Sequence, residues 1–591
     1  MPTMLCSCNH PVFMYSIRLL APVLLLLSPV VQTQAQQVSQ PIIRYDAIHH
    51  PVSALEGMVV SQNVLSSRVG AKILEQGGNA TDAAVATAFS LAVTLPRAGN
   101  LGGSGFALIY DSNQHKASAL DFRSVAPQNA KVEQFRNAEG RIDWPSLTFG
   151  PKAAAVPGTI AGLYMAWQQH GSMAWKDLVQ PAIDQAKNGI TVSEDLAFAL
   201  GEAQGALKLH PHSWQNYSNE GRPFQQGDLF KQPDLAWSLT QIRDGGADAF
   251  YLGAIAQKFA ESMQTHGGLI SLKDLSQYQV KHRNPIATEY RGNRVITMPP
   301  SSGGGLALLQ MLNVLSEFDL QALPQGSSQS LHVLAEVMKR VNANRRLQEN
   351  GIGDPDFVDV PVKGFLSKEL AKQIALGISM TKATATTELE PLDPQPYESH
   401  DTTHLSVVDA DGNAVSLTYT LGYSFGSAFV VEGTGILLDN QMRNFSLRNP
   451  QHANALAPGK RMVSTMTPTL VFDTNNELFM VTGTPGGSLI HTSLLQLLVN
   501  VIDYGLNIAE ATSRPRIYQA WRKPELTYED GINEDTLKAL EAKGHILLKQ
   551  KNMGSTQSIL ISGDKLLGSA DPRRPNAGAV GVNLSNAPNP L

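Results

Sequence analysis

The stretch 402–420 constrains this chain more than any other, because its apolar residues alternate in two short runs. These runs cover 405–407 and 415–419, and the letters between them, DADGN, are typical of a turn. Alternation on both sides of an Asp/Gly turn predicts a β-hairpin. The preceding polar stretch, PLDPQPYESHD, contains three prolines and predicts an extended loop. A hydroxyl residue, Thr402, therefore stands where a loop becomes a buried strand.

Composition narrows the class of protein. The chain has 591 residues, of which 42% are hydrophobic, and this is ample for a sizeable core. The net charge is −5, only 16% of residues are charged and no basic run occurs, so nucleic acid is not an expected partner. Both cysteines, Cys6 and Cys8, lie in the first ten residues. If this N-terminal segment is removed, the mature chain has no cysteine, which excludes disulfides, cysteine nucleophiles and cysteine-bound metals.

The first 35 residues have the features of a secretory signal. Arg18 precedes the apolar run 19–31, and the small residues Thr33 and Ala35 stand at −3 and −1 of a cut after Ala35. The run is short for a membrane-spanning helix, although an uncleaved anchor is the alternative. We expect a signal peptide over 1–35 and a mature protein in the periplasm or secreted, with no membrane attachment after cleavage.

Further buried elements follow from apolar patterns. Residues 83–95 are apolar on all faces and predict a buried helix, and GFALIYD and ASALDF predict two strands. A second hairpin over 468–481 runs into GTPGGS and a long apolar helix. The pair Gly486 and Gly487 at this helix start is either a tight turn or an oxyanion hole built from backbone N–H groups.

Two other features have competing interpretations. The glycine turn at 99–105 lacks the Lys-Ser/Thr end of a phosphate loop, which disfavours nucleotide binding. Arg123 ends the second predicted strand. It is either a structural or surface charge, or a guanidinium fork for a substrate carboxylate.

Taken together, these stretches resemble the gamma-glutamyltransferases (gamma-glutamyltranspeptidases, glutathione hydrolases), which are N-terminal-nucleophile hydrolases. The stretches that match in family order are GGNATDAAVA (77–86), the glycine turn (99–105), DFR (121–123), AVPG (155–158), MPPSSGGG (298–305), TTH with SVVD (402–409), TYTL (418–421), GILLDNQM (435–442), STMTPT (464–469), GTPGGS (483–488) and DPRR (571–574). The resemblance implies an α+β fold, a four-layer αββα sandwich. It also implies a precursor that cuts itself at Asp401–Thr402 into a large subunit, 36–401, and a small subunit, 402–591.

Self-cleavage explains the need for a threonine. Its hydroxyl attacks the preceding carbonyl, the resulting ester hydrolyses, and a new N-terminal amine remains. With a reference pKa of about 7.7–8.0, this amine can activate its own hydroxyl. The resemblance assigns the site by position: Thr402 as nucleophile, Thr420 as the assisting hydroxyl, Gly486 and Gly487 as the oxyanion hole, Arg123, Ser464 and Thr465 for the substrate α-carboxylate, and Gln441 near its α-amino group. For Gln441, a purely structural role beside Asn440 is an equal alternative.

Three departures from the family pattern bear on specificity. The family usually has Asp at Asn444, where it pairs with the substrate α-ammonium, and many bacterial members have Asn at Gly422. The loop between Asn444 and Ser464 is also shorter than in members with a lid. Loss of a charge-assisted bond, worth ~1.5–3 kcal/mol, weakens selection for the ammonium.

Three functions therefore remain. The first is gamma-glutamyl hydrolysis and transfer on glutathione or related peptides, with water, amino acids or peptides as acceptors. The second is an acylase of the same fold acting on glutaryl-type amides, which the departures favour. The third is an inactive secreted peptide-binding homologue. No metal or organic cofactor is expected, since His404 has no second ligand at metal spacing and DADGN lacks the later Glu of a calcium loop.

Overall fold

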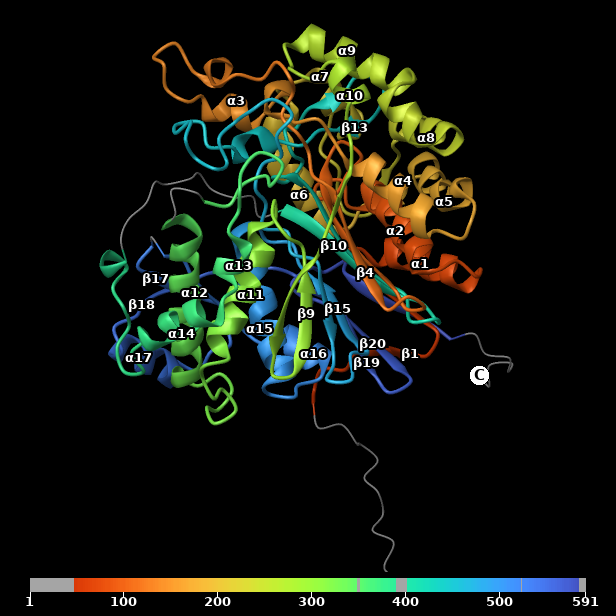
Figure 1. Cartoon of the computed structure of the whole chain (residues 1–591). Coiled ribbons are helices and arrows are strands. Elements are labelled where there is room, and N and C mark those ends of the chain that lie inside the picture. The colour runs from red at the N-terminus through yellow and green to blue at the C-terminus, as the bar shows by residue number, and fades with distance from the viewer. Residues whose placement is uncertain (1–46, 348–350, 390–400, 522, 584–591) are drawn as a thin grey trace, which may run out of the picture. The chain divides into compact units, whose positions relative to one another are not determined.

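In the computed structural model, the described residues are 47–347, 351–389, 401–521 and 523–583. The expected signal peptide (1–35), the start of the large subunit (36–46) and most of the proline-rich approach to Thr402 (390–400) lie outside them. Two seven-stranded antiparallel sheets lie at the centre of the described part (Figure 1).

Both sheets combine strands from before and after Thr402. The first has the order β21 (Gly578–Val582), β2 (Gly57–Ser61), β10 (Asp401–Val408), β11 (Ala414–Gly422), β3 (Ser104–Asp111), β4 (Lys116–Phe122) and β7 (Lys281–Arg283). The second has the order β1 (Val52–Ala54), β20 (Lys565–Ala570), β19 (Gln557–Ser562), β15 (Leu478–Gly483), β14 (Thr469–Phe472), β9 (Asn293–Thr297) and β8 (Ile286–Tyr290). Cleavage at Thr402 would leave each sheet shared by two chains.

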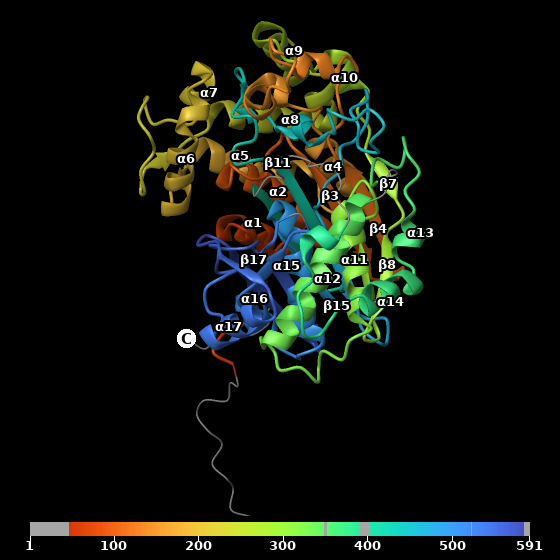
Figure 2. The same ribbon diagram turned by 90° about the vertical axis from the view of Figure 1, so that its left-hand side faces the viewer.

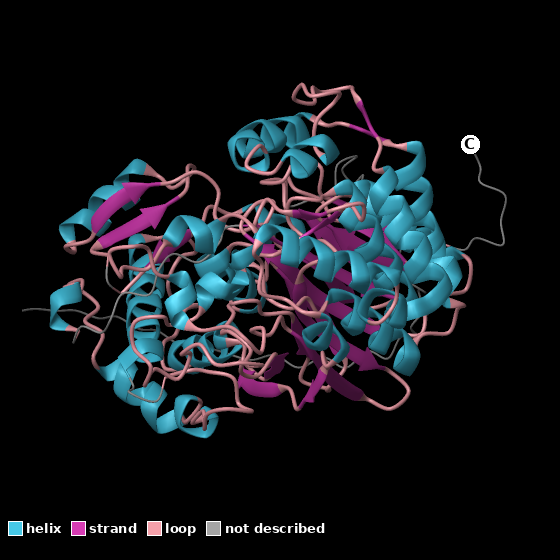
Figure 3. Cartoon of the chain, turned by 90° about the horizontal axis from the view of Figure 1, so that it is seen from above, coloured by secondary structure: helices cyan, strands magenta, loops and turns pink. Residues whose placement is uncertain are grey.

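Helices cover the outer face of each sheet. On the first lie α1 (Val64–Glu75), α2 (Ala80–Thr94) and α4 (Thr159–His170), with α5 (Trp175–Asn188) and α8 (Pro233–Tyr251) packed outside them. On the second lie α11 (Gly303–Leu315), α15 (Ile490–Ile502) and α16 (Ile508–Ser513), flanked by α12 (Ser328–Leu347) and α14 (Lys368–Leu376). Figure 1 shows the two groups on opposite sides of the paired sheets, Figure 2 views the molecule from the side of the second group, and Figure 3 shows the strands between the groups. The predicted αββα sandwich is confirmed.

Further helices and strands complete the fold. They are α3 (Trp144–Thr148), α6 (Glu194–Leu207), α7 (Pro211–Asn216), α9 (Ala254–His266), α10 (Leu272–Ser276), α13 (Val362–Phe365), α17 (Glu534–Ala542), β5 (Ile190–Thr191), β6 (Leu229–Phe230), β12 (Val430–Val431), β13 (Ile436–Leu437), β16 (Ile517–Gln519), β17 (Glu525–Tyr528) and β18 (Ile546–Lys549). No helix among the described residues has the length and apolar character needed to cross a membrane.

The buried helix α2 shows how the sequence builds the outer layer. All of its 15 residues are buried, because it lies between the first sheet and the helices α4 and α5. Asn79 caps its start and Asp82 completes a capping box. The helix predicted at 83–95 is confirmed.

The layer between the two sheets is polar near Thr402. Alternate residues of β10 and β11 face the second sheet and bond to its backbone: Ser406 Oγ donates to the carbonyl of Gln557, and Ser416 Oγ to that of Thr482, both over 2.9 Å. His404 lies between the Thr418 and Ser406 hydroxyls, at 2.8 and 3.1 Å. Burial lowers the pKa of His404 to about 3, so it is neutral and has a structural role.

The turn of this hairpin is held by Asp409. Its Oδ1 accepts the N–H groups of Asp411 and Asn413, and its Oδ2 accepts that of Ala80 over 2.8 Å. These oxygens are engaged by hydrogen-bond donors, as expected of an Asx-type turn. The hairpin is thereby attached to the start of α2.

Candidate active site

Thr402 is the second residue of β10. The pairing of β10 with β11 shifts register between Asp401 and Thr403, an irregularity that re-aims a side chain. The Oγ1 of Thr402 donates a hydrogen bond to the Oγ1 of Thr420 over 3.1 Å. Both residues are buried, with exposed fractions of 5% and 4%. The hairpin thus joins the two hydroxyls that were predicted to act together.

A backbone group fixes the accepting hydroxyl. The N–H of Gly422 also donates to Thr420 Oγ1, over 2.8 Å. Because the proton of Thr402 is directed at Thr420, the lone pairs of the Thr402 oxygen point elsewhere. This orientation suits a nucleophile that attacks from the side away from Thr420.

Gly422 leaves no room for a side chain. Its φ of 96° favours glycine, and the Oδ1 of Asn440 occupies the space into which a Cβ would project. Asn440 is held there by the N–H of Tyr423 and by the carbonyl of Thr148, each at 3.1 Å. Glycine at this position departs from the asparagine of many family members and would remove a polar group from the site. The structure places the amide of Asn440 beside that position instead.

Arg123 follows β4 and is 1% exposed. Its guanidinium donates to Gln441 Oε1 over 2.6 Å, to Ser104 Oγ over 3.3 Å and to the carbonyl of Met462 over 3.4 Å. The same oxygen of Gln441 accepts the Nδ2 of Asn444 over 2.7 Å. Gln441 therefore links the guanidinium to position 444.

Ser464 and Thr465 lie between the start of α11 and the glycine turn. The carbonyl of Ser464 accepts the N–H of Gly303 over 2.8 Å, and its Oγ accepts that of Met466 over 3.1 Å. Thr465 Oγ1 donates to the carbonyl of Gly487 over 2.8 Å. Contact between this hydroxyl and a substrate carboxylate would require its proton to turn away from Gly487.

The glycine turn adopts a backbone that favours glycine. Gly486 has a φ of 135° and Gly487 a φ of 55°, and a short 3₁₀ turn over Gly487–Leu489 separates them from α15. Successive backbone N–H groups in a turn of this kind can be directed toward one anion. The pair can therefore serve as the predicted oxyanion hole.

These groups lie at one end of the paired sheets. The ring of His404 packs directly on Gly483, the last residue of β15, so that a Cβ there would clash with it. Thr402 lies two residues before His404, and the glycine turn begins three residues after Gly483. Met462 connects Arg123 with the segment leading to Ser464. If Thr402 is the nucleophile and the glycine turn binds the oxyanion, as predicted, this arrangement would suit acyl transfer from a carboxylate-bearing donor.

A protein-family model described as Gamma-glutamyltranspeptidase matches residues 66–581 of this chain. The chain belongs to the gamma-glutamyltranspeptidase family. The glutathione hydrolase proenzyme of Escherichia coli (strain K12) is 44% identical over 537 residues, which are 89% of this chain and 92% of that relative. The acylase ACY 1 proenzyme of Pseudomonas sp. (strain SE83) is 35% identical over 541 residues, 90% and 95% of the two chains. A solved cephalosporin acylase from Bacillus halodurans superposes with a TM-score of 0.81 at 28% identity, covering 92% of this chain and 99% of that one.

Family membership confirms the predicted enzyme class. The protein is a gamma-glutamyl hydrolase or transferase, and its relatives are made as proenzymes. The similarity to acylases shows that the same scaffold also occurs in proteins with that name.

Sequence reasoning overlooked Asp439 in the gamma-glutamyltranspeptidase stretch GILLDNQM. An acidic residue directly after an apolar run was the available signal. Its Oδ1 accepts the N–H groups of Ala155 and Gln441 over 2.9 and 3.2 Å, and its Oδ2 accepts Ser124 Oγ over 2.5 Å. Burial raises the pKa of Asp439 from 3.8 to about 7, although the positive charge of Arg123 opposes this rise. Asp439 therefore positions Gln441 through its backbone.

We expect Asp439→Asn to remove a pH-dependent loss of stability. Between pH 4 and 7 the folded wild type keeps a proton that the unfolded chain has released, so its unfolding free energy falls as pH rises. An Asn retains the Oδ1 contacts and can donate to Ser124, without an ionisation. The free energy of unfolding of the variant should rise relative to that of the wild type between pH 4 and pH 8, by at most about 4 kcal/mol. Urea unfolding at both pH values measures it, and a gap that is constant with pH would contradict the assignment.

Proposed function

We propose that this protein cuts itself at Asp401–Thr402 and then transfers gamma-glutamyl groups through an ester on Thr402, with glutathione or related gamma-glutamyl peptides as donors. Water, amino acids or peptides are the acceptors. The mature enzyme consists of a large subunit, 36–401, and a small subunit, 402–591, in the periplasm or secreted after removal of residues 1–35. No nucleic acid and no organic cofactor take part.

The observation that carries this proposal is the 3.1 Å contact between Thr402 and Thr420. In the precursor, Thr402 Oγ1 attacks the carbonyl carbon of residue 401, and the amide becomes an ester as the nitrogen of Thr402 takes up the proton. Water hydrolyses that ester, which leaves a carboxyl group on residue 401 and a free amine on Thr402. Thr420 orients the hydroxyl in both states.

The same hydroxyl then performs turnover. The free amine of Thr402 accepts the proton of Oγ1, the oxygen attacks the γ-carbonyl of the donor, and N–H groups of Gly486 and Gly487 stabilise the oxyanion. The proton passes to the leaving amine as the C–N bond breaks. Water or an amine acceptor attacks the ester in turn and regenerates Thr402.

Recognition of the donor is assigned to the residues around Gln441. Arg123, with Ser464 and Thr465, binds the α-carboxylate, because a buried guanidinium favours a planar anion. Gln441 and Asn444 lie on the α-amino side. The relative named glutathione hydrolase supports glutathione as a donor.

A second candidate, hydrolysis of glutaryl-type amides, is favoured by one specific observation. Asn444 offers an amide where a carboxylate would pair with an ammonium, and its Nδ2 is directed at Gln441. The similarity to cephalosporin acylase and to acylase ACY 1 supports this second function.

Paired substrates distinguish the two functions. The purified protein is assayed with gamma-glutamyl and glutaryl amides of the same aniline, which differ only in the α-ammonium group. The proposed function predicts a higher kcat/KM for the gamma-glutamyl amide. A higher value for the glutaryl amide would establish the acylase, and an uncut chain without turnover would indicate the inactive peptide-binding homologue.

We expect Asn444→Asp to increase selection for the ammonium. The new carboxylate adds a charge-assisted bond, so the ratio of kcat/KM for the gamma-glutamyl over the glutaryl amide should rise roughly 10- to 100-fold. Asn449→Asp is the matched control, since it adds the same charge at an exposed position of the same loop. Equal changes in both variants would contradict a local ion pair.

A further inference from the structure

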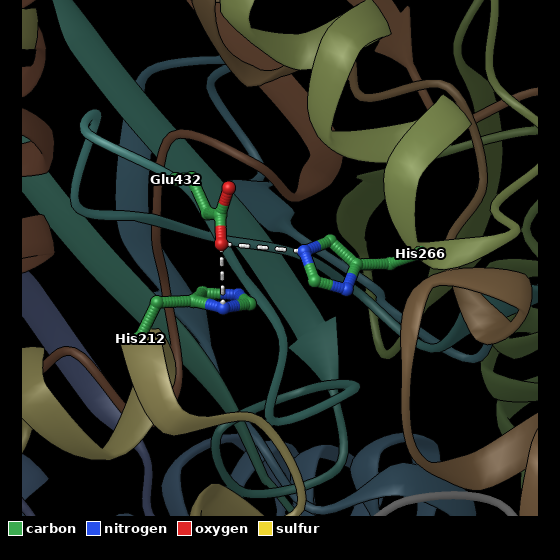
Figure 4. Close-up of side chains that lie close together, drawn as sticks. All are labelled: His212, His266 and Glu432. Carbon is green, nitrogen blue, oxygen red and sulfur yellow. Dashed lines mark hydrogen bonds and ion pairs between the residues drawn. The ribbon is translucent and has the colours of Figure 1, made fainter.

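Two histidines and a glutamate from three separate segments converge away from the residues of the candidate active site. His212 lies on α7, His266 is the last residue of α9 and Glu432 directly follows β12. Figure 4 shows the three side chains pointing toward one another. Glu432 Oε1 lies 3.2 Å from His212 Nδ1 and 3.3 Å from His266 Nε2. We propose that these three residues bind a divalent transition-metal ion of the Zn²⁺ type.

The distances fit a metal centre. A zinc ion about 2.0–2.2 Å from each ligand atom, in tetrahedral geometry, places those atoms about 3.3–3.4 Å apart. Both contacts of Glu432 match this spacing, and all three ligand atoms lie within 4.8 Å of one another. Two imidazoles with one carboxylate form a donor set that suits zinc, with a fourth position for water.

The surroundings hold the ligands in a state ready to bind. The ring of Phe429 packs edge-on against His212 and His266, with centroids 5.1 and 5.4 Å away, and restricts both rings. The Glu432 side chain is 49% exposed, so an ion can enter from solvent.

The simpler alternative is a hydrogen-bonded trio. In it, each imidazole donates a proton to Glu432 and no ion is bound. His210 provides the contrast: its ring centroid is 5.8 Å from that of His212, but its Nε2 faces Gly150, and it is not part of the ligand group. A variant at His210 therefore changes the histidine cluster without removing a ligand.

The site connects the two parts of the chain. His212 and His266 precede Thr402, whereas Glu432 follows it. If the chain is cut at Asp401–Thr402, as the proposed function holds, the ion joins the large subunit to the small one. Metal binding by itself does not depend on that cut, so the two proposals can fail separately.

The test is metal binding by the purified protein without residues 1–35, and thus without cysteines, after treatment with EDTA. Zn²⁺ is titrated by calorimetry, and the metal that remains after dialysis is measured by mass spectrometry. We expect one tightly bound Zn²⁺ per protein in the wild type and in His210→Gln, and at least about 100-fold weaker binding in His266→Gln and Glu432→Gln. Mg²⁺ should not bind, because it prefers oxygen ligands.

Thermal unfolding provides the second readout. Zn²⁺ should raise the midpoint of the wild type and of His210→Gln, and leave that of Glu432→Gln unchanged. Glu432→Gln keeps the size of the side chain and a hydrogen-bond acceptor, so without metal its midpoint should stay close to that of the wild type. Absence of tight binding in the wild type, or equal binding in the wild type and both ligand variants, would overturn the proposal.

Discussion

Thr402→Ala should leave the precursor as one chain and abolish turnover. Loss of the hydroxyl removes both the attack on residue 401 and the formation of the acyl ester, so activity should fall by at least about four orders of magnitude. Thr402→Ser retains a hydroxyl and should still be processed. The measurement combines a denaturing gel, intact masses and initial rates.

Thr403→Val is the matched control for this variant. The hydroxyl of Thr403 is buried and has no hydrogen-bond partner among the residues that the structure describes, and valine has nearly the same shape. We expect this variant to be processed and active within a few-fold of the wild type. Loss of processing in Thr403→Val, or processing in Thr402→Ala, would place the nucleophile elsewhere.

Arg123→Lys should reduce kcat/KM for a gamma-glutamyl donor by roughly 100- to 1,000-fold. A lysine keeps the charge but loses the planar fork, and it cannot donate to Gln441 and to a carboxylate in the same geometry. Steady-state rates over a range of donor concentrations measure the effect, which should appear mainly in KM.

A donor without the α-carboxylate separates recognition from general damage. The 4-aminobutyryl amide keeps the amine and the scissile bond but has nothing for Arg123 to bind. Its kcat/KM should change no more than a few-fold in Arg123→Lys. Equal losses on both donors would show that Arg123 supports the fold rather than the substrate.

Much of the fold could be predicted from the sequence patterns of the strands. Alternation predicted the hairpin β10–β11, and two apolar runs on either side of a polar turn predicted the hairpin β14–β15; both are confirmed. The sequence did not show that the polar alternate residues, such as Ser406 and Ser416, face a second sheet. In a four-layer sandwich both faces of a strand are covered, so a polar side chain on a strand does not show that this face is exposed to solvent. Strand β21 was missed because its residues, GAVGV, are small and have no alternating pattern.

The site depended on contacts that a sequence cannot place. A register shift of one residue decides whether Thr402 meets Thr420, and no local pattern encodes it. The contact of Arg123 with Gln441 joins residues 318 positions apart. Likewise, the amide beside Gly422 comes from Asn440, and the group around Glu432 comes from three distant segments.

In the proposed reaction, a cut chain beginning with Thr402 carries the acyl group. The direct measurement is to mix the purified protein with a slow gamma-glutamyl donor, quench with acid, and map the masses of both chains. We expect a small chain that starts at Thr402 and is heavier by one glutamyl group on its first peptide. Turnover by an uncut chain, or an acyl group on any other residue, would contradict it.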